Sequence, residues 1–349
     1  MRARAAGQPV TATPPGLQAV RLRVDEELRT FLERRRAEVA RADPDAAPLV
    51  EELIRLVAAG GKRIRPAMCY WGYRAAGGED EPRIIRAAAA LELLHTFAIV
   101  HDDVMDQSPV RRGVPATHAR LAEEHRRRDV GGDSAHFGVS IAILAGDLAA
   151  VYADRMFLES GFRPERLIEP KRRYDAMRVD MAAGQFLELT GGPDVEEPLA
   201  RRISSLKTGS YTIRGPLLIG AALAGGSPEL DERLSSYAAP LGEAFQVRDD
   251  VTDVLEHEGG DLAQGRPTIV LAKAGQLVPP ERRERLAALA PAEMVQELRA
   301  SGALDAAIAH ANGLVDEALM ALSRAELAPE PAEALGQLAA FVSIGGPSR

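Results

Sequence analysis

The stretch AAAALELLHTFAIVHDDVMD, residues 87–106, joins the most apolar run of this chain to a group of three aspartates. A run that is apolar on every side predicts a helix buried in a core. At the end of such a helix, Asp102 and Asp106 lie one turn apart on the same face and repel each other. A hard cation such as Mg²⁺ binds carboxylate oxygens and would offset that repulsion. The stretch therefore predicts a core helix that carries a metal site at its end.

A second copy of the acidic pattern, DDVTD at 249–253, follows the largely apolar segment 238–247. Asp249 and Asp253 again share one helix face. A single aspartate cluster on a helix is more often a solvated face than a metal site. Two copies, each beside a segment that reads as buried, favour a functional interpretation, because buried helices rarely end in unpaired carboxylates. We expect the two motifs to face each other and to hold Mg²⁺ together with a phosphorylated ligand.

Basic residues lie in three constrained segments that could supply the cations for such a ligand. Each residue alone is typical of a solvated surface charge. Together with the aspartates, they match what binding two polyphosphate groups requires, since arginine and lysine neutralise phosphate oxygens that the metal does not take. The segments are GGKRIRP at 60–66 with Lys62, Arg63 and Arg65, PVRRGVP at 109–115 with Arg111 and Arg112, and SLKTGSYT at 205–212 with Lys207 and Thr208.

The composition of the 349 residues indicates a globular protein of 46% hydrophobic content, and its net charge of −8 argues against nucleic acid as a partner. Cys69 is the only cysteine, which excludes an intrachain disulfide and favours a reducing compartment. Residues 1–16 lack an apolar signal region and read as a disordered tail. Residues 87–100 are too short to cross a bilayer. We expect a cytoplasmic protein without an integral membrane segment.

Glycine- and proline-rich breakers divide the rest of the chain into segments of helical length. Apolar residues recur between them at spacings of three and four, and no segment alternates in the manner of a strand. The sequence predicts an all-α, single-domain helical bundle over residues 17–349, without strands. Its central helices are expected at 87–100, 139–151 and 216–224, and its breakers at 77–82, 129–134, 160–165, 190–198, 225–230, 256–260 and 277–281.

From about residue 50 to about residue 275, the chain resembles the trans-isoprenyl diphosphate synthase, or polyprenyl synthetase, family. The motifs come in that family's order and approximate spacing. The resemblance implies an all-α isoprenoid synthase fold with a central, largely apolar cavity, a Mg²⁺-dependent prenyltransferase and a homodimer. It is carried by GGKRIRP (60–66), LLHTFAIVHDDVMD (93–106), the RRG triplet at 111–113, LAGDLA (144–149), GQFLEL (184–189), LKTG (206–209), FQVRDDVTD (245–253) and GDLAQGRPT (260–268).

The resemblance also implies roles for individual residues. Asp102, Asp106 and Asp249 resemble the direct metal ligands, with Asp103, Asp250 and Asp253 beside them. The diphosphate of isopentenyl diphosphate would be held by Lys62, Arg65, His95 and Arg112. The allylic diphosphate would be held by Arg111, Lys207, Thr208 and Gln246. Mg²⁺ is the expected cofactor, and Mn²⁺ would suit the same carboxylates.

The chemistry implied by the resemblance needs no nucleophilic side chain. Metal and cations stabilise the departing diphosphate, and the double bond of isopentenyl diphosphate attacks the allylic carbocation. Because water would quench that cation, the cavity must be dry. Three positions depart from the family pattern. The loop at 255–260 is short, Arg266 stands where a lysine is usual, and Glu188 replaces an aspartate.

Two other functions are compatible with parts of this pattern. A terpene cyclase on the same fold would need the first acidic motif but neither GGKRIRP nor an intact second motif. A non-catalytic subunit of a heteromeric synthase would typically lack motif aspartates. This chain keeps all of these features, so elongation is the favoured interpretation.

Product length is predicted from the residues just before the first acidic motif. A growing chain that runs along this helix would meet Ala98, Phe97 and Leu94 one to two turns before Asp102. In the family, an aromatic residue five positions before the motif with a small residue at four resembles the twenty-carbon producers. Phe97 and Ala98 fit that arrangement and predict geranylgeranyl diphosphate, with farnesyl diphosphate as the alternative. Phe97 as an ordinary core residue is the other interpretation.

Overall fold

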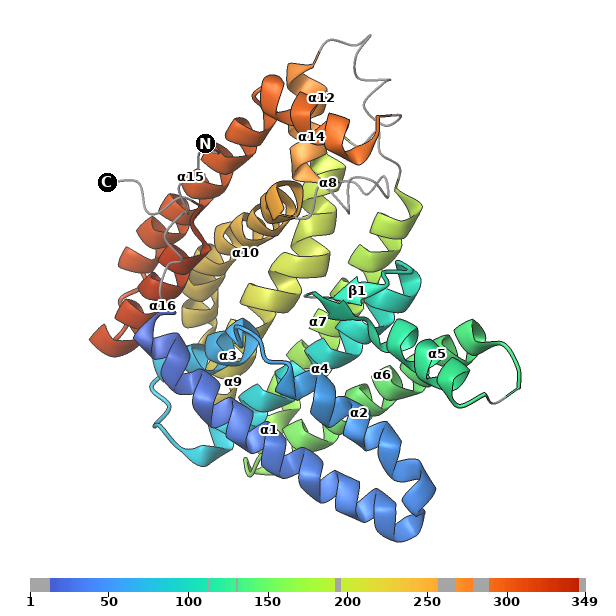
Figure 1. The fold of residues 1–349 in the computed structure, drawn as a ribbon. Coiled ribbons are helices and arrows are strands. Elements are labelled where there is room, and N and C mark those ends of the chain that lie inside the picture. Colours follow the sequence, from blue (N-terminus) through green and yellow to red (C-terminus); the bar gives the residue numbers. More distant parts are fainter. Residues whose placement is uncertain are drawn as a thin grey trace, which may run out of the picture. The chain divides into compact units, whose positions relative to one another are not determined.

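A computed structural model describes residues 13–111, 113–129, 131–191, 196–256, 268–278 and 289–344. The described chain is almost entirely helical, which confirms the predicted all-α fold class (Figure 1). Its helices are α1 Pro15–Ala42, the 3₁₀ turn η1 Pro44–Ala46, α2 Ala47–Ala58, α3 Ile64–Ala75, α4 Pro82–Met105, α5 Thr117–Arg127, α6 Ser134–Leu158, α7 Pro164–Thr190, α8 Glu197–Ser204, the π-helix η2 Ser205–Arg214, α9 Gly215–Ala224, α10 Pro228–Glu256, α12 Ile269–Leu277, α14 Pro291–Ala300, α15 Ala303–Ser323 and α16 Pro329–Val342.

Helix ends coincide with the predicted breakers. The helix α4 starts at Pro82, after the glycines at 77–78, and α10 starts at Pro228, after the glycines at 225–226. Proline at the first position of a helix loses no hydrogen bond, and its fixed φ suits the helix, so it starts helices readily. Gly225 ends α9 in the left-handed conformation at φ 84°, which glycine adopts without steric cost. Local chemistry of this kind makes the boundaries readable from sequence.

The prediction that the chain has no strands is wrong at one place. Two-residue strands β1 (Val110–Arg111) and β2 (Val114–Pro115) pair antiparallel, with Val110 opposite Pro115 and Arg111 opposite Val114. Gly113, at φ 77°, supplies the left-handed conformation in the turn. Strands of two residues are too short to show alternation, so the sequence pattern could not reveal them.

The chain groups into two compact units. The N-terminal unit comprises Ala19–Tyr70 and Asp80–Leu167, and the C-terminal unit comprises Trp71–Glu79 and Ile168–Arg349, together with the chain up to Gln18. A single domain over 17–349 with a central apolar cavity stays a prediction. Of the predicted tail, residues 1–12 lie outside the described residues, and α1 already begins at Pro15.

In the N-terminal unit, α4 packs against α6 and α2 and is buried along most of its length. Its alanines at 87–90 are fully buried, as the sequence predicts for a central helix. The segment 139–151 of α6 differs from its prediction. Ile143, Leu144 and Val151 are exposed, so α6 is central on one face only. An Ala-rich apolar segment looks the same in sequence whether its second face meets the core or the surface.

A buried ion pair connects the helices around α4. Glu92 lies within the buried part of α4, and Arg63 Nη1 donates to its Oε1 at 2.5 Å. The same guanidinium donates from Nε to Asp25 Oδ1 at 2.7 Å and from Nη2 to the Val57 carbonyl at 2.8 Å. A buried carboxylate needs such a partner, because removal of one member of a buried pair costs about 3–5 kcal/mol. The pair therefore fixes the loop that precedes α3 against α4.

In the C-terminal unit, α10 packs against α15, η2, α12 and α16. Val247, Val251 and Val254 recur along one face of α10 and join a buried cluster with side chains of α12, α14 and α15. The segment 216–224 in α9 is largely buried, as predicted. The apolar face of α10 thus fixes the orientation of the helix, and the aspartates of 249–253 are distributed around it.

Within the described part of the chain, two helices, α4 and α6, are long and apolar enough to cross a membrane by length and composition alone. The apolar window of α4 is 67% buried, as expected for a core helix, whereas that of α6 is 28% buried. Since α4 is 24 residues long, it exceeds the segment 87–100 that the sequence analysis judged too short. Its buried Glu92, paired with Arg63 of the loop before α3, is typical of a helix in a protein core. A cytoplasmic location stays a prediction.

Candidate functional site

The first acidic motif forms the last turn of α4. Asp102 and Asp103 lie inside the helix, and Asp106 caps its end, where its N–H donates to the Asp102 carbonyl at 2.8 Å. Asp103 is only 3% exposed, whereas Asp102 and Asp106 are half-buried. The motif therefore divides into one inner carboxylate and two outer ones, and the outer pair comes from the same helix face.

Arg111, in the short hairpin, holds the inner carboxylate. Its Nε donates to Asp103 Oδ1 at 2.7 Å, and its Nη2 lies 3.4 Å from Asp102 Oδ2. Burial raises the pKa of Asp103 above its usual value, and the Arg111 guanidinium offsets part of that rise. The hairpin that sequence analysis missed thus brings a predicted substrate cation onto the acidic motif.

The basic segment 60–66 divides in a similar way. Lys62 is exposed and Arg65 is half-buried in the first turn of α3, so both are compatible with an anion site. Arg63 is buried and committed to Glu92, which contradicts its inclusion among the converging cations. Its backbone has φ 53°, a left-handed conformation that is uncommon outside glycine. Arg63 thus combines a left-handed backbone with a buried side chain. No local sequence signal indicated either feature.

The second acidic motif repeats the division seen in the first. Asp249 is exposed, Asp253 is half-buried, and Asp250 is 7% exposed. Gln246 Nε2 donates to Asp250 Oδ1 at 2.6 Å, and the Ile269 N–H donates to its Oδ2 at 3.3 Å. Thr208 Oγ1 donates in turn to Gln246 Oε1. Two predicted ligands of the allylic diphosphate therefore lie in one hydrogen-bonded chain with the inner aspartate.

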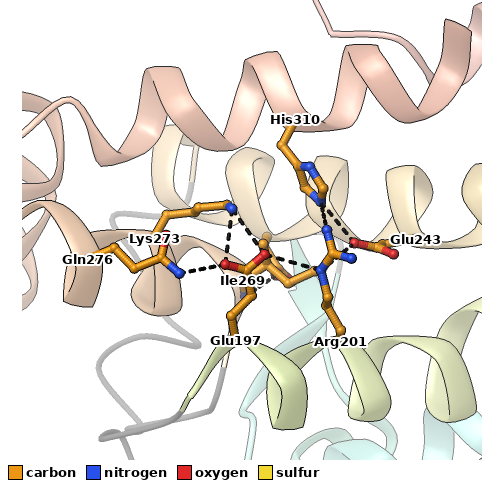
Figure 2. A network of polar contacts seen from close by, with 8 residues as sticks. Glu197, Arg201, Glu243, Ile269, Lys273, Gln276 and His310 are labelled. Atoms are coloured by element: carbon orange, nitrogen blue, oxygen red, sulfur yellow. Dashed lines mark hydrogen bonds and ion pairs between the residues drawn. The ribbon is translucent and has the colours of Figure 1, made fainter.

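A polar network at α12 supports that arrangement (Figure 2). Lys273 Nζ and Gln276 Nε2, both on α12, donate to Glu197 of α8 at 3.0 and 2.6 Å. Arg201, also on α8, lies 3.2 Å from Glu243 of α10 and 3.1 Å from His310 of α15. These contacts attach α12, whose first residue donates to Asp250, to α8. Sequence analysis did not identify this network, since its members are far apart in the chain.

The π-helix η2 carries Lys207 and Thr208. Helices of the π type are rare and occur frequently at functional sites. One face of α7 runs along η2, where Asp180 Oδ2 accepts from Ser210 Oγ at 2.9 Å and Glu188 Oε2 accepts from Lys207 Nζ. The glutamate that departs from the family pattern therefore orients a predicted substrate cation.

Two glycines allow the backbones of α7 and α10 to approach η2 closely. A Cβ on Gly184 of α7 would lie 2.5 Å from Lys207 N, and a Cβ on Gly242 of α10 would lie 2.6 Å from Gly209 Cα. Both neighbours are backbone atoms, so no side-chain rotation could relieve the contact. The absence of a side chain at these two positions sets the distance of η2 from α7 and α10.

The predicted chain-length residues lie along α4. Leu94 is fully buried, and Phe97 and Ala98 are half-buried. His95 is half-buried as well, so it is not the enclosed core histidine that would exclude a ligand role. Phe97 stacks edge-on against His101, with ring centroids 4.7 Å apart. Sequence analysis did not identify His101 as a neighbour of this group, although the spacing of four residues on a helix was available to it.

The outer aspartates are Asp102 and Asp106 at the end of α4 and Asp249 and Asp253 on α10. Their carboxylate oxygens are ligands that suit a magnesium ion. Within the described ranges, no three Asp, Glu, His or Cys side chains converge on one position that could hold a metal. Asp102 and Asp106 belong to the N-terminal unit and Asp249 to the C-terminal unit. The facing arrangement of the two motifs stays a prediction. Arg112 and Arg266 lie outside the described residues.

Comparison with known proteins gives concordant results. The family model of polyprenyl synthetase matches residues 47–304. The short chain isoprenyl diphosphate synthase of Methanothermobacter thermautotrophicus is 32% identical over 343 residues, which cover 92% of this chain and 98% of that protein. The geranylfarnesyl diphosphate synthase of Aeropyrum pernix is 32% identical and covers 78% of this chain and 86% of that one.

A solved structure is similar along nearly the whole chain. It is the geranylgeranyl pyrophosphate synthase of Corynebacterium glutamicum, complexed with isoprenyl diphosphate and magnesium. The TM-score is 0.86 at 31% identity, with 95% of this chain and 99% of that chain covered.

The close contact at Gly242 yields a prediction. In Gly242→Ala, η2 must move away from α10, which lengthens the hydrogen bond from Thr208 to Gln246. Thr208 moves with η2 and loses its predicted hydrogen bond to the allylic diphosphate. Since loss of one hydrogen bond to a charged ligand costs about 1.5–3 kcal/mol, we expect KM for the allylic diphosphate to rise at least tenfold. KM for isopentenyl diphosphate should change little, as measured by steady-state kinetics. Gly313→Ala, where a Cβ meets nothing within 4 Å, is the control; equal effects in both variants would contradict the prediction.

Proposed function

Because this chain belongs to the polyprenyl synthetase family and is a trans-prenyltransferase that makes short-chain products, we propose a specific reaction for it. It condenses isopentenyl diphosphate with an allylic prenyl diphosphate to geranylgeranyl diphosphate, in a Mg²⁺-dependent reaction. One observation carries this proposal. In both acidic motifs the inner aspartate is buried and held by protein donors, while the outer aspartates are more accessible.

That division supports a metal site, because ligands bind best when their neighbours hold them in place. Arg111 fixes the turn of α4 that carries Asp102 and Asp106, and Gln246 fixes the turn of α10 that carries Asp249. These outer aspartates would hold Mg²⁺, with Asp253 beside them; Mn²⁺ would suit the same oxygens. The related enzyme from C. glutamicum is complexed with magnesium and isoprenyl diphosphate. When bound, the metal supplies positive charge that stabilises the leaving diphosphate.

The basic residues form two groups in this proposal, one for each substrate. Lys62, Arg65 and His95, with Arg112, would bind the diphosphate of isopentenyl diphosphate. Arg111, Lys207, Thr208 and Gln246, with Arg266, would bind the allylic diphosphate. Arg111 and Lys207 are already oriented by ion pairs with Asp103 and Glu188, so little side-chain entropy is lost when the substrate binds. Preorganised cations of this kind stabilise charge as it develops on the leaving group.

The alternative functions lose support from the same residues. A cyclase does not require the cations of GGKRIRP, because it does not bind isopentenyl diphosphate. A non-catalytic subunit does not require inner aspartates that are held by hydrogen bonds. Here Asp103 and Asp250 are both buried and hydrogen-bonded. The related proteins named above are synthases.

An assay with a charge-removing variant tests the proposed reaction. Purified protein with Mg²⁺, isopentenyl diphosphate and an allylic diphosphate should yield a condensation product whose main component is geranylgeranyl diphosphate, identified by mass spectrometry. In Asp102→Asn, loss of charge at the leaving group should lower kcat by roughly 10²–10³, since one such electrostatic contact is worth about 3–4 kcal/mol. A cyclised product, or a variant that keeps more than half of the activity, would contradict the proposal.

Product length is proposed to depend on Phe97 and Ala98. If the Phe97 ring limits the growing chain, Phe97→Ala should give products longer than wild type. Ala98→Phe should shorten them by at least one five-carbon unit, because the added ring occupies the path of the chain. Chromatography of dephosphorylated products measures both shifts. Unchanged distributions in both variants would leave Phe97 as an ordinary packing residue.

A homodimer is proposed to form through α6. Phe137, Leu144, Val151 and Leu158 recur every seven residues along this helix, and all are exposed. Such a stripe is typical of a helix that packs on another helix. A second copy of this chain fits it because an isologous interface needs only one self-complementary surface.

The stripe can be tested by adding charge to it. Val151→Glu should shift the protein from dimer to monomer in light scattering, because a buried carboxylate at the interface would lack a partner. Leu22→Glu serves as the control, since Leu22 on α1 is 61% exposed and Val151 is 59% exposed. A dimer that survives Val151→Glu at low protein concentration would contradict the assignment of α6 as the interface.

A further inference from the structure

His101 occupies a notch in the surface of α6 that only glycine permits. A Cβ on Gly146 would lie 2.3 Å from both Cδ2 and Nε2 of the His101 ring. Real Cβ atoms do not approach a ring so closely, so any other residue at 146 would displace the imidazole. Glycine is a poor residue for the interior of a helix, yet it lies near the middle of α6. Glycine at 146 therefore lowers the helix propensity of α6 but makes the contact with His101 possible.

The imidazole is held in this notch by further contacts. His101 Nε2 lies 3.1 Å from the Ile143 carbonyl oxygen, at hydrogen-bond distance, and 3.7 Å from Asp147 Oδ1. Both partners belong to the turn of α6 that contains Gly146. The ring is thus bounded by backbone on one side and held at one nitrogen, and both contacts restrain its orientation relative to α6.

The other side of the imidazole contacts Phe97. The two rings lie 4.7 Å apart between centroids, at an interplanar angle of 63°, which is the edge-on arrangement that aromatic rings prefer. Phe97 precedes His101 by one turn of α4, so their side chains meet along the same helix face. Phe97 itself is only half-buried, and a half-buried ring has more than one rotamer open to it unless a neighbour excludes the others. His101 is such a neighbour.

We propose that His101 and Gly146 are positioning residues for product length: the notch at Gly146 fixes the His101 ring, and that ring fixes Phe97 in the orientation that stops chain growth. The inference rests on the proposed function of Phe97 and extends it to two residues that do not contact the product. A stop that turned to another rotamer would open the path, because a change of χ1 moves the whole ring rather than one atom. A sharp product length therefore needs a fixed ring as well as a large one.

Product distributions in five variants test this inference. We expect Gly146→Ala, which displaces the imidazole, to add products one five-carbon unit longer than wild type. His101→Gln, which keeps a polar group near the Ile143 carbonyl but removes the ring, should do the same. Phe97→Ala tests the stop itself. The double variant Phe97→Ala/His101→Gln should match Phe97→Ala alone, since His101 acts through Phe97 and the two effects cannot add. Gly313→Ala is the control for a helix glycine in open space.

The readout is the ratio of products at equal conversion, which a loss of rate or of stability does not shift. His101 adjoins Asp102, so a lower reaction rate is expected in His101→Gln. That lower rate neither supports nor contradicts the inference. A shift in Phe97→Ala without any shift in Gly146→Ala and His101→Gln would overturn the inference while the role of Phe97 stands. No shift in Phe97→Ala would overturn both. If Gly146→Ala does not fold, as judged by its thermal transition, His101→Gln and the double variant decide the question.

Discussion

A carboxylate that is buried without a cation or a hydrogen-bond donor costs several kcal/mol, and this chain buries three of them in helices that carry function. Glu92 is paired with Arg63, Asp103 with Arg111, and Asp250 with Gln246 and the Ile269 N–H. Arg63, Arg111 and the Ile269 N–H come from other segments of the chain, and Gln246 precedes Asp250 by one turn of α10. The requirement for a cation or a hydrogen-bond donor therefore attaches the loop before α3, the hairpin after α4 and the start of α12 to the two helices that carry the acidic motifs.

This constraint explains how one helix can serve as core and as part of a site. Along α4 the alanines at 87–90 are buried, the helix packs against α6, and Glu92 is neutralised inside the core by Arg63. Nearer its end, the face with Phe97 and His101 contacts the α6 turn at Gly146, and the last turn presents Asp102. Because these groups share a rigid helix, their spacing along the axis is fixed at about 1.5 Å per residue. If the product grows along α4 away from the aspartates, the distance from Asp102 to a blocking side chain would set its length.

The sequence was informative where the chemistry is local. Glycine and proline act on their own neighbours, so the starts of α4 and α10 at Pro82 and Pro228 could be predicted. It misled where the partner is distant. Arg63 stands between two residues that fit an anion site, yet its guanidinium is taken by Glu92. The apolar residues of 139–151 predict a central helix, yet one face of α6 is exposed, since hydrophobicity alone does not show which face of a helix is buried.

Departures from the family pattern are also clearer in three dimensions. Glu188 replaces an aspartate, and it accepts from Lys207 on the neighbouring π-helix. The Gly184 contact, one helical turn earlier on α7, brings the backbone of Lys207 close to α7, and the Lys207 ammonium donates to Glu188 one turn further along. A glutamate has one methylene more than an aspartate. An aspartate at 188 would hold its carboxylate farther from this ammonium unless the Lys207 side chain or a backbone moved. The longer acid therefore fits this chain's own spacing between α7 and η2, and the cation that it orients is retained.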